Sequence, residues 1–536
     1  MVRVAIVGAG ASGLPAIRHA LAYGFEPVAF EASDHIGGLW KYTPESADES
    51  SVMLSTVMNT SKELTAYSDF PPPPEFANFM HNKQLFRYLE LYAEHFGLKD
   101  YIRFKHRVVS VERTEDYDES GAWKVTFEDL ESNATSAEVF DAVLLAKGHH
   151  ANPFLPQFEG QSRFSKEIIH AQSYKNERGF DGKRIVVVGI GNSGADIAAD
   201  VSRVAKEVFL STRRGSWVFN RLADYGIPFD LLFNTQYNSW KLKTFPERMN
   251  RLVEGRLTQM LDYDLYGLKP KHRPLQCTPT INDDLIMRLA SGMVKIKPNI
   301  RKFTERGVVF EDGTFVDEVD MVIMCTGYSF DYSIVEGGSL IRVDEGDVDL
   351  YLQVFPPALA SHNTLGVLGL VQPNGSIIPI SEMQARLFFD VLAAKSTLPS
   401  EEEMRTAIAE FKERKSQLTI DSKRHHLEIN FVQYLNSLAE MMGCMPNIPY
   451  LFITDPSLAW QLLFGPTVSY MYRLCGRHKW QGARDAVMSV DERVNRGINP
   501  KWKKRAKEGG FLISVKTGLT VSILLACMTV VYSCFN

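Results

Sequence analysis

The chain has 536 residues, of which 45% are hydrophobic and 23% are charged, so it is globular and long enough for two or three domains. Its net charge of −5 provides no basic field for binding a nucleic acid. The six cysteines include no C-x-x-C pair, which argues against a redox dithiol or a zinc site and suits a reducing compartment.

The first predicted elements are a strand, a glycine-rich loop and a helix. Residues 4–7 are apolar, and the loop after them reads Gly8-Ala9-Gly10-Ala11-Ser12-Gly13. In such loops the first glycine makes a tight turn, the second lets the backbone approach a pyrophosphate, and the third packs the helix on the strand. Glu31 ends the next strand, where an acid accepts a hydrogen bond from a ribose hydroxyl. This unit therefore predicts an FAD site.

Less distinctive elements lie between this unit and the next. Apolar residues at helical spacing predict a helix over 86–95. A strand pair is expected near 102–112 and 123–128. A buried strand over 142–146 then ends at Lys147-Gly148.

A second strand–loop–helix unit follows near residue 182. Residues 185–188 lead into Gly189-Ile190-Gly191-Asn192-Ser193-Gly194, and the next strand, 208–212, runs into Arg213-Arg214. An arginine at that position suits a 2′-phosphate, so the second loop predicts an NADPH site. Two such loops, with an acid after the first unit and arginines after the second, are stronger evidence for dinucleotide binding than one loop alone. The alternative is that one loop is an ordinary turn between a strand and a helix.

The later elements set the domain organisation. The stretch 217–273 has too mixed a period for an assignment, whereas 321–324 forms a buried strand that ends at Thr326-Gly327 and returns the chain to the first domain. The sequence predicts an α/β fold with two Rossmann-like dinucleotide-binding domains, the NADPH domain being inserted into the FAD domain, plus a C-terminal transmembrane helix. The expected boundaries are 1–155 and 325–445 for the FAD-binding domain, 156–324 for the NADPH-binding domain with an insertion at 217–273, 446–510 for a membrane-proximal region, and 511–533 for the anchor.

The end of the chain has the composition of a membrane anchor. Residues 501–507 are rich in lysine and arginine, and 511–535 are largely apolar, with no charge over 518–532. Crossing a bilayer takes about 20 apolar residues, and basic residues on the N-terminal side keep the catalytic part in the cytoplasm. The apolar run at the N-terminus is too short for a signal peptide. The alternatives for 511–535 are a segment in the membrane interface and a buried C-terminal helix.

Residues 183–198 resemble the flavin-containing monooxygenases, and further matches extend nearly end to end. These matches are Gly37-Gly38-Leu39-Trp40, Asn59-Thr60-Ser61-Lys62-Glu63 and residues 67–71, 355–357, 375–379, 462–466 and 479–484. The apolar C-terminus is similar to that of the microsomal animal branch, which implies the endoplasmic reticulum membrane with the catalytic part cytosolic. Within that branch, residues 149–150, 211–215 and 267–273 most resemble the mammalian form-five enzymes.

Two positions depart from the family pattern. The linker signature F-x-G-x-x-x-H-x-x-x-Y runs here from Phe164 through His170 to Tyr174, with Lys166 in place of the glycine. If the glycine requires a positive φ, a lysine there costs about 1 kcal/mol or more. Lys147 stands where relatives usually carry a threonine, and it either alters the flavin pocket or points to solvent.

The resemblance implies a reaction and its cofactors. NADPH reduces FAD, the reduced flavin captures O₂, and the resulting C4a-hydroperoxyflavin oxygenates soft nitrogen or sulfur atoms of small molecules. The flavin then does the hard chemistry, while the protein supplies placement and excludes water. The sequence suggests no Ser–His–Asp triad, metal cluster or paired-carboxylate site, and it is compatible with an oligomer.

The same resemblance assigns the site residues. Asn59 would be the catalytic residue nearest the reacting atoms, because a neutral amide can donate a hydrogen bond without protonating the intermediate; its alternative role is a turn with Thr60 and Ser61. The residues expected to bind FAD are Gly8, Ala9, Gly10, Ala11, Ser12, Gly13, Glu31, Leu39, Trp40, Asn59 and Thr60. The residues expected to bind NADP are Met58, Asn59, Gly191, Ser193, Gly194, Ala195, Asp196, Arg213 and Arg214. Trp40 could instead be core packing, and Asp196 could cap or support the helix turn.

Other activities remain open at this point. Baeyer–Villiger oxygenation of ketones and an NADPH oxidase that releases H₂O₂ are variants of the same chemistry. A membrane-tethered NADPH-binding protein without turnover is the non-enzyme alternative, prompted by Lys147 and Lys166. A pyridine nucleotide–disulfide reductase would need a closely spaced cysteine pair, and the sequence has none.

Overall fold

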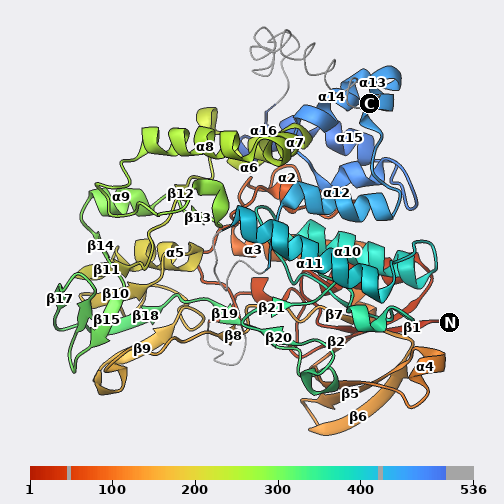
Figure 1. The fold of residues 1–536 in the computed structure, drawn as a ribbon, viewed down its shortest axis with the longest axis horizontal. Helices are drawn as coiled ribbons and strands as arrows, with labels where there is room; N and C mark the ends of the chain where they lie inside the picture. Colours follow the sequence, from red (N-terminus) through yellow and green to blue (C-terminus); the bar gives the residue numbers. More distant parts are fainter. Residues whose placement is uncertain (45–49, 420–426, 503–536) are drawn as a thin grey trace.

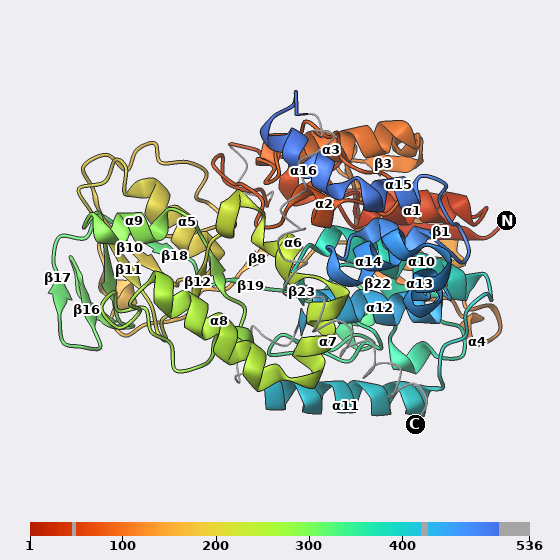
Figure 2. The same ribbon diagram turned by 90° about the horizontal axis from the view of Figure 1, so that it is seen from above.

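The computed structural model describes residues 1–44, 50–419 and 427–502. Its two parallel sheets lie in opposite halves of an elongated molecule (Figures 1 and 2). The first sheet has five strands in the order β22-β7-β1-β2-β3. These strands are β1 (Arg3–Val7), β2 (Glu26–Glu31), β3 (Ile102–Phe104), β7 (Ala142–Leu145) and β22 (Leu365–Val367). The chain reverses its direction of winding at β1, and a crevice for ligands is expected at the carboxyl end of such a strand.

The second sheet repeats this arrangement. Its five parallel strands follow the order β14-β11-β10-β18-β9. They are β9 (Glu167–His170), β10 (Arg184–Val188), β11 (Glu207–Ser211), β14 (Val294–Lys297) and β18 (Met321–Met324). All of them lie between β7 and β22 in the sequence. The predicted α/β fold with two Rossmann-like sheets is confirmed.

Helices cover the faces of the sheets, and every residue of β7 and β18 is buried, as expected for inner parallel strands. α1 (Gly13–Ala22) follows β1, and α5 (Asn192–Val201) follows β10. The other helices are α2 (Lys62–Thr65), α3 (Asn82–His95), α4 (Tyr117–Ser120), α6 (Phe229–Phe233), α7 (Gln236–Thr244), α8 (Pro246–Met260), α9 (Leu285–Ala290), α10 (Ile377–Leu392), α11 (Glu401–Leu418), α12 (Phe431–Met441), α13 (Ile448–Thr454), α14 (Pro456–Phe464), α15 (Ala483–Met488) and α16 (Val490–Ile498).

Two small antiparallel sheets and several two-residue strands complete the fold. One antiparallel sheet contains β4 (His106–Arg113), β5 (Trp123–Asp129) and β6 (Ala134–Phe140), and the other contains β15 (Ile300–Phe303), β16 (Val308–Phe310) and β17 (Phe315–Val316). The short strands are β8 (Asn152–Pro153), β12 (Val218–Phe219), β13 (Thr280–Ile281), β19 (Tyr328–Ser329), β20 (Val343–Asp344), β21 (Asp347–Val348), β23 (Gln372–Pro373) and β24 (Glu428–Ile429).

One expectation about local structure needs correction, and one unassigned stretch is now defined. The strand predicted near 102–112 is two strands, because Lys105 has φ 56° and turns the chain between β3 and β4. As a result, β3 joins the first parallel sheet beside β2, and only β4 pairs with β5. The unassigned stretch 217–273 is largely helical, with α6, α7 and α8.

The predicted membrane anchor at 511–533 lies outside the described residues. Within residues 1–44, 50–419 and 427–502, no helix has both the length and the apolar character required to cross a bilayer.

A buried charge cluster joins the C-terminal part of the chain to the first domain. Glu382 of α10 accepts hydrogen bonds from the Ser68 backbone N–H at 2.6 Å and from the Arg473 guanidinium at 3.2 Å. The same carboxylate lies 3.1 Å from Nε2 of His19 in α1, and Arg473 also reaches Asp69 at 3.0 Å. Segments far apart in the sequence are therefore held together by buried ionic contacts.

We expect His19 to make the protein sensitive to mild acid. Burial lowers the pKa of His19 to about 3, whereas an unfolded histidine titrates near pH 6.5. Below that pH the unfolded chain binds a proton that the folded chain does not, so the His19 contribution to stability is complete above about pH 6.5 and falls towards about pH 3, by about 1.4 kcal/mol per unit.

The measurement is the free energy of unfolding of wild type and His19→Gln across this range. Buried Asp196 and Asp230 act in the opposite direction, because burial raises the pKa of each to about 6. The comparison removes their contribution, since both proteins contain them. We expect the stability advantage of wild type over the variant to shrink by about 2 kcal/mol between about pH 7.5 and about pH 5. A constant difference would contradict the role of His19.

Candidate active site

The first glycine loop has the shape that a dinucleotide requires. Gly8 has φ +102°, and a Cβ at this position would lie 2.7 Å from the carbonyl oxygen of Ala146. A Cβ on Gly13 would lie 1.9 Å from the carbonyl oxygen of Gly8. At Gly10, by contrast, the nearest atom to a Cβ would be 3.7 Å away. The protein thus requires glycine at 8 and 13, while the open side at Gly10 is the one that a pyrophosphate would approach.

Glu31 stands beside this loop, at the end of β2. One carboxylate oxygen accepts from the backbone N–H of Ala9 at 2.8 Å, and the other accepts from the N–H and the hydroxyl of Ser33, each at 2.9 Å. These bonds fix the carboxylate at the position where a ribose hydroxyl of bound FAD would donate to it. The residues of this corner therefore fit the adenosine part of FAD.

The Gly37–Trp40 segment also reaches the loop. The N–H of Gly37 donates to Ala9 O at 3.0 Å, and the next three residues form a short 3₁₀ helix. Trp40 is half-buried and packs against the core of the first domain. The packing role considered for Trp40 is thus present, while part of the residue remains exposed.

The second glycine loop repeats the geometry of the first. Gly189 has φ +107°, and a Cβ there would lie 2.5 Å from the carbonyl oxygen of Cys325. A Cβ on Gly194 would lie 1.8 Å from Gly189 O. Ala146 and Cys325 therefore have the same structural role, and the turns after them, Lys147-Gly148 and Thr326-Gly327, are equivalent. The described residues thus include two loops built alike, each with the geometry that a dinucleotide requires; we call residues 8–13 the first cradle and residues 189–194 the second cradle.

Most of the residues predicted to bind NADP lie at this second loop or just after β11, whereas Met58 and Asn59 lie before α2. Gly191 is the N-cap of α5, and Ser193, Gly194 and Ala195 lie in its first turn, so backbone N–H groups face the place of a phosphate. Arg213 and Arg214 are exposed just after β11, which suits contact with a 2′-phosphate.

Asp196 supports a neighbouring loop in this structure. Its carboxylate accepts from the side-chain amide of Asn282 at 2.6 Å, and no side-chain hydrogen bond caps α5. Burial raises the pKa of Asp196 to about 6, and the nearby Arg221 opposes this effect. The role considered for Asp196 as a helix cap is therefore not observed.

Asn59 lies where the first domain meets the 217–273 insertion. Its Oδ1 accepts from Nη2 of Arg221 at 2.7 Å. Arg221 also donates from Nε to the Met58 carbonyl oxygen at 3.0 Å and from Nη1 to Asp283 at 2.7 Å. Sequence reasoning missed both Arg221 and Asp283, because nothing in the sequence pairs residue 221 with a segment 162 positions away.

The two departures from the family pattern are accommodated without strain. Lys147 is half-buried and donates to the carbonyl oxygen of Asp331 at 2.9 Å, and burial lowers the pKa of this lysine. Lys147 therefore does not simply point to solvent, and its hydrogen bond to Asp331 holds the side chain in place. Lys166 is exposed and is not among the residues with positive φ, so the strain considered for it is absent.

His170 is a structural residue of the linker. Its Nδ1 accepts from the N–H of Gln172 at 3.1 Å, so the proton must be on Nε2, which donates to Gly327 O at 3.0 Å. Burial lowers the pKa of His170, and the neutral ring holds the turn that closes the second cradle.

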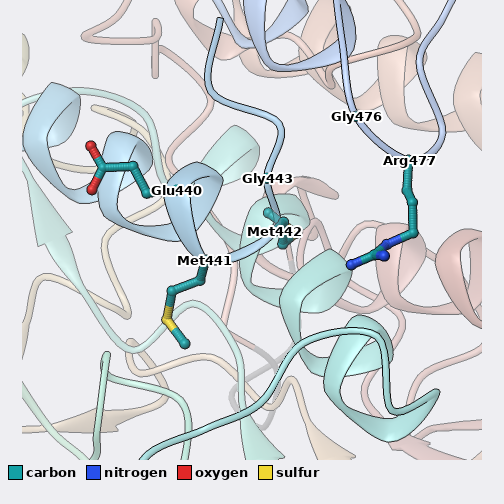
Figure 3. A pocket seen from close by; sticks show the side chains of 6 residues that line it. All are labelled: Glu440, Met441, Met442, Gly443, Gly476 and Arg477. Atoms are coloured by element: carbon teal, nitrogen blue, oxygen red, sulfur yellow. The ribbon is translucent and has the colours of Figure 1, made fainter.

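A hollow lined by residues of other segments is separate from these loops. Figure 3 shows the residues that line it, and its volume is about 490 Å³. The lining residues are Glu440, Met441, Met442, Gly443, Gly476 and Arg477. None of them belongs to a glycine loop, so the candidate active site lies at the two cradles and Asn59.

Comparisons with known proteins agree with this geometry. Residues 1–533 match a family model described as flavin-binding monooxygenase-like. The chain is 45% identical to rabbit (Oryctolagus cuniculus) flavin-containing monooxygenase 5 over 501 residues, which covers 92% of this chain and 93% of that protein. It is 41% identical to mouse (Mus musculus) dimethylaniline monooxygenase [N-oxide-forming] 2 over 497 residues, covering 92% of each chain.

Solved structures show the same fold. S-allyl-L-cysteine S-oxygenase from Allium sativum superposes with a TM-score of 0.63 at 23% identity and covers 92% of this chain and 98% of its own. Cyclohexanone monooxygenase from Rhodococcus sp. Phi1, bound to NADP⁺, gives a TM-score of 0.59 at 16% identity, with 82% and 97% covered.

Proposed function

The chain belongs to the flavin-binding monooxygenase-like family, and we propose that it oxygenates small molecules at soft nitrogen or sulfur atoms. The resemblance found in the sequence is thereby confirmed, including its likeness to the form-five enzymes. The protein is an NADPH-dependent flavin monooxygenase, with FAD and NADPH as its cofactors. The proposal concerns its substrates and the residues that carry the reaction.

The observation that best supports the residue assignment is the repeated glycine loop, because the residue that follows the next strand has opposite charge in the two units. Glu31 follows the first cradle and Arg213 follows the second, so the first suits a ribose and the second a 2′-phosphate. The backbone N–H groups of each loop would bind a pyrophosphate, and Asn59 would donate a hydrogen bond between the two cofactors. Bound FAD would supply the redox chemistry, accepting a hydride from NADPH and activating O₂.

The names of similar proteins state the atoms that those proteins oxygenate, and these atoms support the proposed substrate class. The mouse relative forms N-oxides of dimethylaniline, and the Allium sativum enzyme oxygenates a sulfur atom. Both atoms are soft nucleophiles, which an electrophilic oxygen donor would attack. The test is a product assay with purified protein, NADPH, a thioether, a tertiary amine and a ketone. Ester from the ketone without sulfoxide or N-oxide would replace the proposal by Baeyer–Villiger oxygenation, and H₂O₂ alone would replace it by an oxidase.

Replacing Arg213 and Arg214 together with alanine should relax the preference for NADPH over NADH. Loss of charge-assisted hydrogen bonds to the 2′-phosphate should cost about 1–3 kcal/mol, which is about a fivefold to 150-fold fall in the ratio of the two kcat/KM values. Flavin reduction by each nucleotide measures this ratio. An unchanged ratio would mean that other residues bind the phosphate.

We also propose the membrane attachment and the domain boundaries. Residues 511–533 would form a single-pass anchor in the endoplasmic reticulum membrane, with the catalytic part cytosolic, because the segment is apolar and follows basic residues. Truncation before Phe511 should release active protein from membranes, and full retention would place the attachment elsewhere. The proposed domains are 1–155 with 325–445, then 156–324, and finally 446–510 next to the membrane.

A further inference from the structure

We propose that Arg221 is a positioning residue that fixes the side-chain amide of Asn59, so that the NH₂ group rather than the carbonyl oxygen is presented to the bound cofactors. This inference rests on the proposed role of Asn59. It assigns a function to an interdomain contact and states which end of the amide takes part in the reaction.

The orientation of the amide follows from the chemistry of arginine. A guanidinium has five N–H donors and no acceptor, so only the carbonyl oxygen of Asn59 can face Arg221. The Oδ1–Nη2 distance of 2.7 Å shows that it does. Nδ2 must then point the other way, and among the described residues no hydrogen-bond acceptor for Nδ2 is found. Arg221 therefore fixes the Asn59 amide in an orientation that leaves its NH₂ group free to donate to a bound cofactor.

The position of Arg221 follows from a short parallel ladder in the second domain. Phe219 of β12 pairs with Ile281 of β13, so the residues two positions further along each strand, Arg221 and Asp283, face each other. Asp283 accepts from the backbone N–H of Arg221 at 2.9 Å and from its Nη1 at 2.7 Å. Only 12% of the Arg221 side chain is exposed. The guanidinium is thus fixed by its own domain before it reaches the other one.

Arg221 holds the backbone next to Asn59 as well as its side chain. Nε donates to Met58 O at 3.0 Å, and Nη2 lies 3.5 Å from Val57 O. A lysine could not make these contacts together, because it lacks the planar fork of donors. The geometry is specific for arginine.

A second contact holds the other side of Asn59. The carboxylate of Asp230 in α6 accepts from the backbone N–H of Ser61 at 2.6 Å. The neighbouring Leu231 is buried in the apolar core of the first domain, and α6 lies near the middle of the molecule (Figure 2). Residues 57–61 are therefore held at both ends by the 217–273 insertion, so the orientation of Asn59 depends on how the two domains dock.

The test compares Arg221→Met, Arg221→Lys and a matched control, Arg256→Met, in the full-length holoenzyme. Arg256 belongs to the same insertion and pairs with Asp224 on the surface, but no contact links it to 57–61. Hydrogen exchange of the peptide containing residues 57–61 gives a readout independent of turnover. We expect about tenfold faster exchange in Arg221→Met, intermediate exchange in Arg221→Lys, and wild-type exchange in the control.

The second readout is the share of consumed NADPH that appears as H₂O₂ instead of oxygenated product. We expect this share to rise severalfold in Arg221→Met, with kcat/KM for oxygenation lowered about tenfold to hundredfold, because misplacing a group at the reacting centre can cost about a hundredfold. If Arg221 acts through Asn59, it should have no further effect in an Asn59→Ala background. An equal effect of Arg221→Met in both backgrounds, or unchanged exchange at 57–61, would overturn the proposal. Failure of wild type to oxygenate any substrate would instead reject the proposed function, and the exchange experiment would still decide the role of Arg221.

Discussion

Replacing Gly13 with alanine is expected to give a colourless protein that does not retain FAD. The new Cβ would lie 1.9 Å from Gly8 O and 2.8 Å from the carbonyl carbon of Gly8, distances at which the atoms overlap. Both partners belong to the backbone, so no side chain can move aside, and α1 must separate from the loop. We expect at least about a hundredfold loss of FAD affinity, or about 3 kcal/mol.

Gly10→Ala separates the effect on the ligand from the effect on the fold. A Cβ on Gly10 would meet no protein atom nearer than 3.7 Å, so the variant should fold like wild type. It should nevertheless bind FAD more weakly, because the methyl group stands where the pyrophosphate approaches the backbone. A yellow Gly13→Ala protein with the flavin content of wild type would contradict the assignment of this loop.

Gly194→Ala is the counterpart in the second loop. Its Cβ would lie 1.8 Å from Gly189 O, so the second cradle should be lost while the first stays intact. The purified variant should be yellow, and its flavin should be reducible by dithionite but not by NADPH. The visible absorbance of the flavin follows both reductions. This pair of variants therefore assigns one cofactor to each loop.

The cradles were predictable from sequence because all their parts are local. A strand, three glycines and the residue ending the next strand fall within one short segment, and each glycine has its own steric reason. The loop geometries at Gly8 and Gly189 agree with that interpretation. The same local logic located the two strand-end turns after Ala146 and Cys325.

Helix α7 of the insertion was not predictable, because it lacks the apolar stripe that marks most helices. The residues that α7 buries are Gln236 and Ser239, which are polar and give no periodic apolar signal. Gln236 hydrogen-bonds Asn436 of α12, so its burial is satisfied by a partner 200 residues away. The burial of α7 therefore depends on tertiary contacts that the local sequence does not reveal.

The contact between Arg221 and Asn59 was hidden for a related reason. The two residues belong to different domains. From the sequence alone, Arg221 could be an ordinary surface arginine, and Asn59 could simply form a turn. The buried charge cluster is similar, because Arg473 pairs with Ser68 and Asp69, which lie 405 and 404 positions away in the sequence. Such ionic pairings leave no pattern in the sequence, since their geometry is set only when the core has formed.

Replacing Arg473 with methionine is expected to destabilise the protein by about 3–5 kcal/mol, the cost of breaking a buried ion pair from one side. Arg473 is 2% exposed. Its guanidinium donates to the Ser68 hydroxyl at 2.6 Å, to Asp69 at 3.0 Å and to Glu382 at 3.2 Å. Methionine fills much of the volume but leaves two buried carboxylates without this cation. Denaturant unfolding of the holoenzyme, followed by tryptophan fluorescence, measures the loss.

Two further variants test the physical cause of that loss. Arg405→Met removes a surface pair with Glu401 on α11 and should cost about 0.5 kcal/mol or less. Glu382→Gln added to Arg473→Met should recover part of the stability, because it removes one of the uncompensated buried charges. If Arg473→Met were as stable as Arg405→Met, the cluster would contribute little to the fold.

The loss of the Arg473 contacts should also weaken the first cradle, because Tyr67 connects the two. The Tyr67 hydroxyl donates to the carbonyl oxygen of Ala11 at 2.7 Å, and Tyr67 directly precedes the Ser68 that Arg473 and Glu382 hold. Loosening Ser68 should therefore loosen the loop that would bind the pyrophosphate. We expect FAD to dissociate faster from Arg473→Met than from Arg405→Met well below the denaturant concentration that unfolds either protein, because the contact to Ala11 fails before the core does.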